Sequence, residues 1–385
     1  MYALVYGTRP ELIKLFPVIR RMREMSLPHT LVSTGQHGEV LSELELELGV
    51  RPDICMSVLR HGLSGPALLG SMIEGLSRVL PETRAAAVVS QGDTFTVLAA
   101  STVAFMLGLP HAHVEAGLRS GDLSAPFPEE YVRRVAAISS SLHFAPTTRS
   151  VQNLLAEGVP DERVHLTGNT IVDMVALATE EWGVPAADAG TVLVTAHRRE
   201  NWGRPISDIA AAVAGLCRQW PGLRFVWPMH PNPELRESIA SALGEPPANL
   251  ELRRPMGYRE SISALAGSRV VLTDSGGLQE EAACLGKDVI VLRESTERPE
   301  LVESGHARLC GHDTGLITKA FGEAMSRRLA PAGPNPLGDG NAARRIVDAI
   351  CAAYLPSADA GWPATGLQKK GYICTPHKTK SQHHA

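Results

Sequence analysis

Two short segments near opposite ends of the chain constrain its fold most: GTRPELIK at residues 7–14 and DSGGLQEEAACLGK at residues 274–287. Each joins an apolar, strand-like run to the start of a helical pattern, with small or polar residues at the junction and a basic residue nearby. The unpaired N–H groups at a helix start carry partial positive charge and attract phosphate. Two such junctions therefore predict two α/β domains that share one phosphorylated ligand.

Length and composition favour this layout and argue against several other classes of protein. A chain of 385 residues exceeds the usual size of one core, and 44% hydrophobic residues are typical of a globular protein. A net charge of −4 without a long basic run argues against nucleic acid as the main partner. We expect no membrane span and no signal peptide. The six cysteines are scattered without a CxxC pair, which predicts free thiols in a cytoplasmic protein and no metal site.

Strand-like and helical patterns alternate along the chain. The first half contains five apolar runs, at residues 2–6, 29–33, 86–90, 110–114 and 142–145. Helical patterns separate them, so right-handed βαβ units and a parallel sheet are expected. Past about residue 170 the alternation restarts with the runs TVLVTAH, RFVWPMH, VVLTDSGG and DVIVLRE. Polar residues follow these runs, and open α/β sheets bind ligands at the carboxyl ends of their strands.

The first half of the chain carries two candidate groups near strand ends. In GTRPELIK, Gly7 permits a tight turn, while Arg9 and Lys14 are candidates for binding a diphosphate. The alternative is that Arg9 lies on the surface and Lys14 solvates a helix face. In SQGDTFT, Asp93 follows a strand and precedes a helix, so it is either a functional carboxylate or a helix N-cap.

A charged segment follows, HAHVEAGLRSGDLSAPFPEEYVRR at residues 111–134. Glu115 sits at a strand end, and Glu129 and Arg133 lie at the start of a helix. A solvated run of charges is the alternative interpretation. Further on, His197 ends a strand and precedes Arg198 and Arg199, which suggests an anion site rather than a structural histidine.

The second junction adds a glycine-rich helix start. Ser275, Gly276 and Gly277 leave room for close approach of a phosphate. Glu281, one turn into the helix, can accept two ribose hydroxyls, and Arg298 follows in a later loop. A plain glycine-rich turn is the alternative. Neither a Walker A motif nor a GxGxxG fingerprint is present, so kinase and NAD functions lack their usual support.

Taken together, these segments resemble one known family, the non-hydrolysing UDP-N-acetylglucosamine 2-epimerases. The matching motifs, in order from residue 1 to about 355, are GTRPELIKLFPVI, TGQH, QGDTFT, HVEAGLRSGD, PEEYVRR, TGNTIVD, TAHRREN, HPNP, DSGGLQEEA and RESTERPE. The resemblance implies a GT-B fold, in which two Rossmann-like domains enclose the active site. It also implies a homodimer, with no nicotinamide or metal cofactor.

The resemblance also suggests domain limits. We expect an N-terminal Rossmann-like domain at residues 1–169 and a UDP-binding Rossmann-like domain at 170–339. The amphipathic segment 340–355 then forms a helix that crosses back to the first domain. Residues 356–385, where four of the seven lysines fall in the last 17 positions, are expected to form a disordered tail.

The implied reaction interconverts UDP-N-acetylglucosamine (UDP-GlcNAc) and UDP-N-acetylmannosamine (UDP-ManNAc) by elimination and re-addition of UDP. Catalytic positions of the family are matched here by Asp93, Glu115, Glu129 and His197. Substrate-binding positions are matched by Arg9, Lys14, Arg133, Ser275, Gly276, Gly277, Glu281 and Arg298. A second, allosteric nucleotide-sugar site is matched by Gln36, Arg198 and His230, although Gly38 and Glu39 depart from the common pattern beside it.

Four alternative functions stay open at this point. A hydrolysing epimerase would release free N-acetylmannosamine and UDP. An epimerase of a modified UDP-amino sugar would share nearly all of these motifs. A GT-B glycosyltransferase would use the same UDP site without the acidic residues, and a non-catalytic UDP-sugar sensor would not need them.

Overall fold

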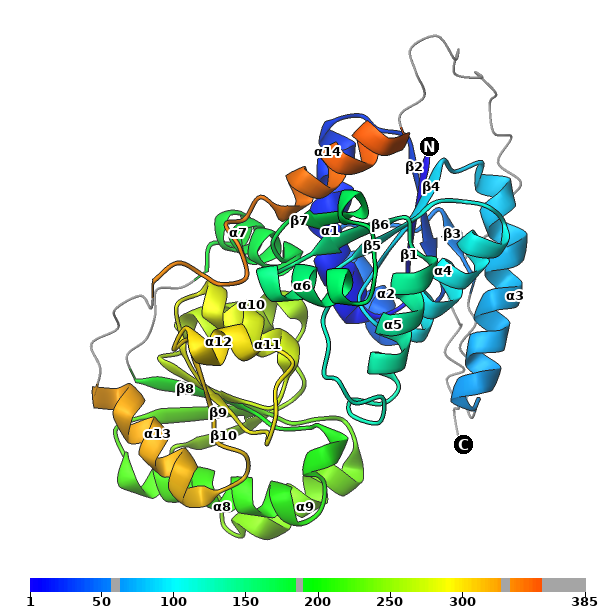
Figure 1. The fold of residues 1–385 in the computed structure, drawn as a ribbon. Coiled ribbons are helices and arrows are strands. Elements are labelled where there is room, and N and C mark those ends of the chain that lie inside the picture. Colours follow the sequence, from blue (N-terminus) through cyan, green and yellow to red (C-terminus); the bar gives the residue numbers. More distant parts are fainter. Residues whose placement is uncertain (57–62, 185–189, 327–332, 355–385) are drawn as a thin grey trace, which may run out of the picture.

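The computed structural model describes residues 1–56, 63–184, 190–326 and 333–354, and it shows two parallel α/β sheets, each covered by helices (Figure 1). The predicted tail at residues 356–385 lies outside the described residues. The domain boundaries near residues 170 and 340 stay predictions. None of the helices in the described ranges is long and apolar enough to cross a membrane.

The first sheet has seven strands in the order β3-β2-β1-β4-β5-β6-β7. Its strands are β1 (Tyr2–Tyr6), β2 (His29–Ser33), β3 (Ile54–Cys55), β4 (Ala87–Gln91), β5 (His111–Val114), β6 (Leu142–Ala145) and β7 (Val164–Leu166). All neighbouring strands pair in parallel, as predicted. The five predicted strands are confirmed, whereas the edge strands β3 and β7 were not predicted.

The second sheet has six strands in the order β10-β9-β8-β11-β12-β13, again all parallel. Its strands are β8 (Thr191–Thr195), β9 (Arg224–Pro228), β10 (Leu250–Arg253), β11 (Val270–Thr273), β12 (Asp288–Val291) and β13 (Ala307–Leu309). The four predicted runs form the four inner strands, and the two edge strands, β10 and β13, were not predicted.

Helices connect the strands on both faces of each sheet. Those of the first half are α1 (Arg9–Glu24), α2 (Glu39–Glu47), α3 (Gly65–Thr83), α4 (Phe95–Met106), α5 (Glu129–Ser139), α6 (Thr148–Ala156) and α7 (Thr170–Trp182). Those of the second half are α8 (Arg204–Gln219), α9 (Pro233–Leu243), α10 (Tyr258–Gly267), α11 (Gly276–Cys284), α12 (Pro299–Glu303), α13 (Thr314–Ser326) and α14 (Ala342–Tyr354).

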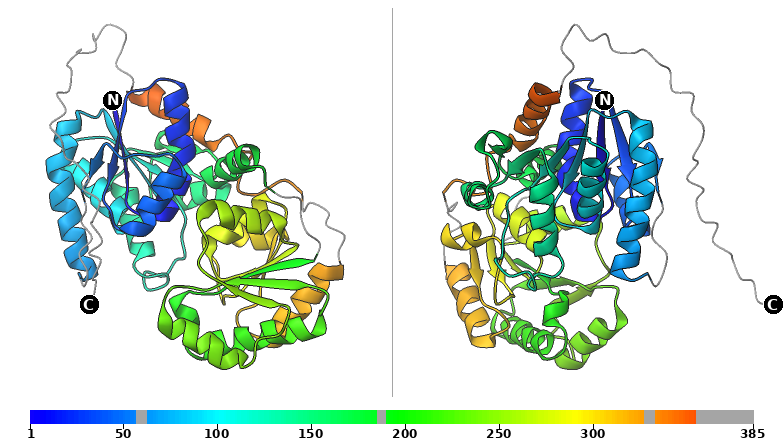
Figure 2. Two further views of the ribbon diagram at one scale, coloured as in Figure 1. Left: turned by 180° about the vertical axis from the view of Figure 1, so that it is seen from behind. Right: turned by 45° about the vertical axis from the view of Figure 1, so that its right-hand side comes forward.

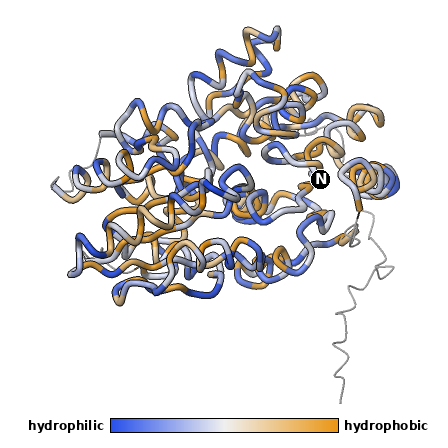
Figure 3. The backbone as a smooth tube through the Cα atoms, turned by 90° about the horizontal axis from the view of Figure 1, so that it is seen from below, coloured by the Kyte–Doolittle hydropathy of each residue, from blue (hydrophilic) through white to orange (hydrophobic). Residues whose placement is uncertain are grey.

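Each sheet is apolar on both faces, because helices cover both. In β1, Ala3 and Val5 face a cluster with α3 and α4, while Leu4 and Tyr6 face α1. The second sheet packs one face against α8, α9 and α13. Its other face, under α10, α11 and α12, belongs to the same apolar cluster as α1. Hydrophobic stretches accordingly run through the interior of the tube drawing, with hydrophilic residues towards the outside (Figure 3).

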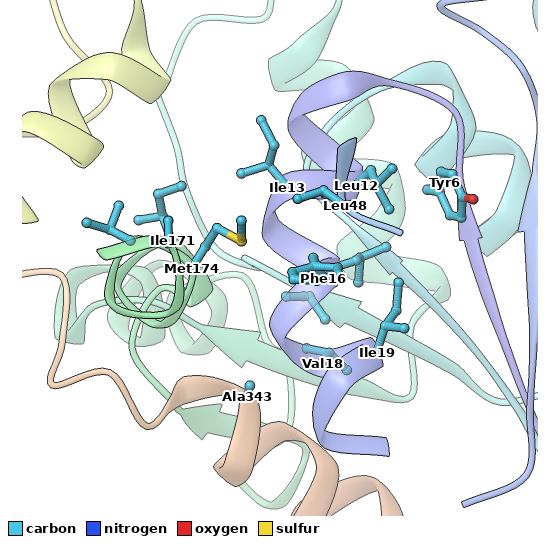
Figure 4. Packing of buried hydrophobic residues seen from close by; sticks show 14 of the residues in the cluster. Tyr6, Leu12, Ile13, Phe16, Val18, Ile19, Leu48, Ile171, Met174 and Ala343 are labelled. Atoms are coloured by element: carbon cyan, nitrogen blue, oxygen red, sulfur yellow. The ribbon is translucent and has the colours of Figure 1, made fainter. Parts of the chain in front are cut away.

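The last helix returns to the first sheet. α14 packs against α1 and α7, and the two views of Figure 2 show it beside α1. Figure 4 shows Ile171 and Met174 of α7 directed towards Ile13 and Phe16 of α1, with Ala343 of α14 close by. This return places the last described helix in one helical layer with α1 and α7 on the first sheet.

A buried carboxylate fixes the start of α14. Asp173, in α7, accepts hydrogen bonds from the backbone N–H groups of Ala342 (3.2 Å) and Ala343 (2.9 Å). These two N–H groups have no partner within their own helix, so an acceptor from another helix satisfies them. Burial raises the pKa of Asp173, and the two N–H donors partly offset this.

We predict that Asp173→Ala lowers the free energy of unfolding by about 1–3 kcal/mol, because two buried N–H groups lose their acceptor. Chemical denaturation monitored by circular dichroism measures this difference. Glu180→Ala, at an exposed position of the same helix, is the matched control and should change stability little. Equal stability of the two variants would contradict the capping role.

Candidate active site

Helices that follow strands of the two sheets meet in the structure. Lys14, in α1 after β1, contacts Glu280, in α11 after β11, with Nζ and Oε2 2.8 Å apart. In Figure 1, α10, α11 and α12 lie on the side of the second sheet nearest the first. A cavity of about 620 Å³ also opens between the loop at residues 118–126 and the segment 293–300. The predicted location between two sheets is therefore where polar residues of both halves meet.

Lys14 is the centre of a buried group of charges. Its Nζ lies 2.6 and 2.8 Å from the two carboxylate oxygens of Glu115, in addition to its contact with Glu280. Arg298 donates from Nε to the other oxygen of Glu280 at 2.5 Å. The Lys14 side chain is 7% exposed, so the alternative that it solvates a helix face is wrong.

The pKa values of this group follow from burial and pairing. Burial would lower the pKa of Lys14, but Glu115 and Glu280 outweigh it, so the net shift is upward. Burial likewise raises the pKa of Glu115, and Lys14 only partly offsets that rise. Burial would raise the pKa of Glu280, but Arg298 and Lys14 outweigh it and bring this pKa below the usual range. The two carboxylates that share Lys14 are therefore not equivalent.

Glu115 also has an unusual backbone. Its φ of 65° lies in the left-handed region, which non-glycine residues seldom occupy. Gln91, at the end of β4, donates its side-chain amide to the Glu115 carboxylate. Such conformations persist where the surroundings enforce them and are concentrated at functional sites. The backbone geometry thus supports a functional role for this carboxylate.

Asp93 is held by an arginine and does not cap a helix. Arg133 contacts Asp93 Oδ2 from both Nε (2.8 Å) and Nη2 (2.6 Å). The N-cap of α4 is Thr94, whose side chain accepts a hydrogen bond from the backbone of Thr96, so the alternative cap role of Asp93 is wrong. Burial would raise the pKa of Asp93, but Arg133 brings it below the usual value.

Glu129 and Glu130 are adjacent but differently placed. Glu129 is half-buried, and its Oε2 has no hydrogen-bond partner among the described residues. Burial raises the pKa of Glu129, and the nearby charge of Asp93 raises it further. Arg198, from the second half of the chain, acts in the opposite direction. Glu130 is fully buried and accepts from the backbone N–H of Ser120 at 2.9 Å. The alternative of a solvated charge run is therefore wrong for this segment.

Asp274, which was not predicted, organises the loop after β8. Its Oδ2 accepts hydrogen bonds from the backbone N–H groups of His197 and Arg198, each at 2.8 Å, and from Asn201 Nδ2 at 2.9 Å. The His197 ring stacks on His230, with centroids 5.7 Å apart. Asp274 thus fixes the direction in which His197 leaves its strand.

The Arg298 guanidinium packs against the glycine-rich start of α11. Ser275 is the N-cap, and its hydroxyl accepts from the backbone of Leu278 at 3.5 Å. A Cβ at Gly276 would lie 2.7 Å from Arg298 Nη1, whereas nothing lies within 4 Å of one at Gly277. Glycine at position 276 therefore allows the guanidinium to approach the helix start.

At the other junction, Gly7 is needed for a different reason from the predicted turn. Its φ is not in the left-handed region, but a Cβ there would collide with the hydroxyls of Thr34 and Thr96. Thr8 and Glu11 form a capping box at the start of α1. Close packing against neighbouring hydroxyls thus requires the glycine.

The remaining predicted residues surround this group of charges. Arg9 donates from Nη1 to the carbonyl of Met256 at 3.4 Å, which links the two halves of the chain. Glu281 is buried, and burial raises its pKa to about 7. Gln36 accepts from the Thr96 hydroxyl at 3.0 Å, and Arg198 lies in the loop of His197. The allosteric assignment of Gln36, Arg198 and His230 stays a prediction.

Sequence reasoning missed Glu280, Gln91 and Asp274. Glu280 precedes the predicted Glu281, and neighbouring helix residues point about 100° apart, so the motif alone could not say which one meets Lys14. Asp274 had the same signal as Asp93, a carboxylate directly after an apolar strand. Among the described residues, no group of three or more His, Cys, Asp or Glu side chains is arranged to hold a metal ion.

Comparisons with known proteins identify the family of this chain. The family model described as UDP-N-acetylglucosamine 2-epimerase matches residues 20–351. The UDP-N-acetylglucosamine 2-epimerase of Escherichia coli K12 is 36% identical over 365 residues, which cover 90% of this chain and 97% of that protein.

Two solved structures are similar throughout. The crystal structure of UDP-GlcNAc 2-epimerase from Neisseria meningitidis bound to UDP-GlcNAc has a TM-score of 0.84 and 35% identity, covering 91% of this chain and 100% of that chain. The Methanocaldococcus jannaschii enzyme in complex with UDP-GlcNAc and UDP has a TM-score of 0.82 and 31% identity, covering 91% and 99%. From the matched motifs, the two facing parallel sheets with their GT-B-like arrangement, and this similarity over nearly the whole length, we conclude that the chain belongs to the UDP-N-acetylglucosamine 2-epimerase family.

Proposed function

We propose that this chain interconverts UDP-GlcNAc and UDP-ManNAc by inverting the configuration at C2 of the sugar. The observation that carries the proposal is the buried meeting of Lys14 and Arg298 with Glu115 and Glu280, from opposite halves of the chain. Cations placed there are suited to stabilise a leaving diphosphate, and carboxylates beside them are suited to move a proton.

The reaction needs an indirect route, because the C2 proton is not next to a carbonyl group and is only weakly acidic. In the proposed route the C1–O bond breaks, its electron pair leaves with UDP, and the C2 proton passes to a carboxylate. The product is 2-acetamidoglucal. UDP then re-forms the C1–O bond while a proton is delivered to the opposite face of C2. No net proton or electron is consumed.

The different surroundings of the carboxylates suit them to different roles. Asp93, with its pKa lowered by Arg133 against the effect of burial, stays ionised and can accept a proton. Glu115 and Glu129, whose pKa values are raised by burial, hold a proton more readily. Pairs of carboxyl groups whose environments move their pKa values apart are typical of acid/base catalysis.

The binding roles follow the same geometry. We assign the diphosphate to Lys14, Arg9, Arg298 and the start of α11 at Ser275, Gly276 and Gly277, with His197 stabilising its departure. Glu281 is assigned to the ribose hydroxyls and Arg133 to the sugar end, where it also holds Asp93. These side chains come from helices and loops of both halves of the chain, so both halves would contact the substrate.

The proposed reaction predicts a specific product. Protein without added NAD or metal, incubated with UDP-GlcNAc in D2O, should give a mixture with UDP-ManNAc that carries deuterium at C2. The gluco isomer should predominate, because its equatorial acetamido group is less crowded. NMR of the sugar nucleotides measures both.

Other products would refute the proposal in identifiable ways. Free N-acetylmannosamine and UDP would indicate the hydrolysing reaction. Turnover of a diacetamido relative without turnover of UDP-GlcNAc would change the substrate and keep the mechanism.

The assigned roles of the carboxylates predict the effect of removing each charge. Asp93→Asn, Glu115→Gln and Glu129→Gln should each lower kcat by roughly a hundredfold or more, the scale of lost acid/base catalysis. Steady-state kinetics measures kcat, and thermal melting shows whether each variant is folded. Glu157→Gln, which removes a surface partner of Arg119, is the control and should retain kcat.

Binding should separate from catalysis in the same set. Arg9→Ala and Arg298→Ala should weaken UDP binding, whereas Glu129→Gln should leave it nearly unchanged. Near-normal kcat in all three carboxamide variants would contradict their catalytic assignment.

We also propose that the chain acts as a homodimer. Large apolar side chains are exposed at the end of α4 and on α5, two helices that pack together: Phe105 is 61%, Met106 76% and Ile138 84% exposed. A second copy of the chain would cover them. Sedimentation equilibrium should give about twice the 41.2 kDa chain mass, and a monomer at micromolar concentration would refute the proposal.

A further inference from the structure

One ammonium group is shared by two carboxylates from opposite halves of the chain. Lys14 Nζ lies within 2.8 Å of oxygens of both Glu115 and Glu280. The two carboxylate side chains are 5% and 1% exposed. Lys14 Nζ lies beside Glu280 Oε2, and Arg298 donates to Oε1 of the same carboxylate, so two cations stabilise its charge. Carboxylates coupled this closely titrate as a pair.

The surrounding buried charges are already balanced. Arg298 pairs with Glu280 and Glu297, and Arg293 pairs with Glu297. Arg133 pairs with Asp93 on the neighbouring strand end. The cations of the buried group therefore have carboxylate partners before any ligand arrives.

A diphosphate diester changes this balance, because it brings two negative charges. Arg9 contacts a carbonyl oxygen, Met256 O, and can offset one of them. When Lys14 turns to the phosphates, Glu115 and Glu280 lose the positive charge that offsets their mutual repulsion. Two close buried carboxylates cannot both stay ionised without a large cost, so one of them takes up a proton.

We propose that binding of the substrate diphosphate draws one proton from solvent onto the Glu115–Glu280 pair. The inference rests on the proposed function, since it takes the ligand to be a UDP-sugar. The proton leaves water or buffer and forms an O–H bond on one carboxylate, while the Lys14 ammonium keeps its protons. The substrate thereby loads a proton next to the sugar, where the reaction needs a donor.

The neighbouring carboxyl groups are poorer acceptors for this proton. Burial would raise the pKa of Glu297, but Arg293 and Arg298 outweigh it and lower this pKa to about 2. Arg133 keeps Asp93 ionised. Glu281, on the ribose side, has a pKa raised by burial to about 7, so it is partly protonated before the ligand binds. By contrast, burial already raises the pKa of Glu115 within the pair.

Calorimetry gives a direct test. UDP-GlcNAc is titrated into the full chain at about pH 7.5 in buffers of different ionisation enthalpy. The slope of the observed binding enthalpy against the buffer ionisation enthalpy gives the number of protons taken up. We expect roughly one proton, and an affinity that falls by up to about tenfold per pH unit above neutrality. UDP-GlcNAc is a better probe than UDP, because the terminal phosphate of UDP titrates at about pH 6 and would itself exchange a proton. Uridine, which lacks the diphosphate, should bind without proton uptake.

Matched variants identify the acceptor. Glu280→Gln should bind UDP-GlcNAc with little or no proton uptake, because one of the paired charges is gone. Glu297→Gln removes another carboxylate beside Arg298 but should keep the uptake, since that group is ionised throughout. Glu281→Gln should also keep it. Thermal melting verifies that each variant is folded.

Three results would overturn the inference: binding without buffer dependence, equal uptake with uridine, or unchanged uptake in Glu280→Gln. The first and third leave the epimerase proposal intact, because deuterium incorporation at C2 tests that separately. Proton-linked binding without any turnover would refute the proposed function alone.

Discussion

The contact between Lys14 and Glu280 is the interaction on which the site depends, because it joins the two halves of the chain in a place from which water is excluded. Burying an ion pair costs several kcal/mol per ion before the attraction is counted, so the pair survives only within a wider network. Glu115 and Arg298 provide that network. The apolar cluster that runs from α1 to α10 and α11 holds the two backbones close enough for these side chains to meet.

The central strands could be predicted because they are covered on both faces. Runs such as YALVY in β1 and VVLT in β11 are buried throughout and carry a continuous apolar signal. The missed strands β3 and β13 have two and three residues, and partly exposed side chains, so they lack such a signal. Edge strands of this kind form because a neighbouring strand offers unpaired backbone groups, which no local pattern records.

The candidate site was predictable in position but not in its pairing. Strand ends and the family resemblance pointed to Asp93, Glu115 and Lys14, and the structure brings Lys14 and Glu115 together. The partner of Asp93 is Arg133, 40 positions away. Arg133 keeps Asp93 ionised, and Thr94 caps the following helix instead. A protonation state depends on which charges tertiary folding brings within a few ångströms, so the sequence could not supply it.

The return of α14 means that the helical layer on the first sheet is built from both ends of the described chain. Ile346, Val347 and Ile350 fill the apolar layer beside α1 and α7, yet they lie about 340 residues after α1 begins at Arg9. During synthesis the ribosome must therefore release almost the whole chain before the first sheet can be sealed on that side. Until then α1 and α7 expose the surface that α14 later covers, and the nascent protein is open to misassembly over that interval. The half of the chain that is made first is thus the last to be completed.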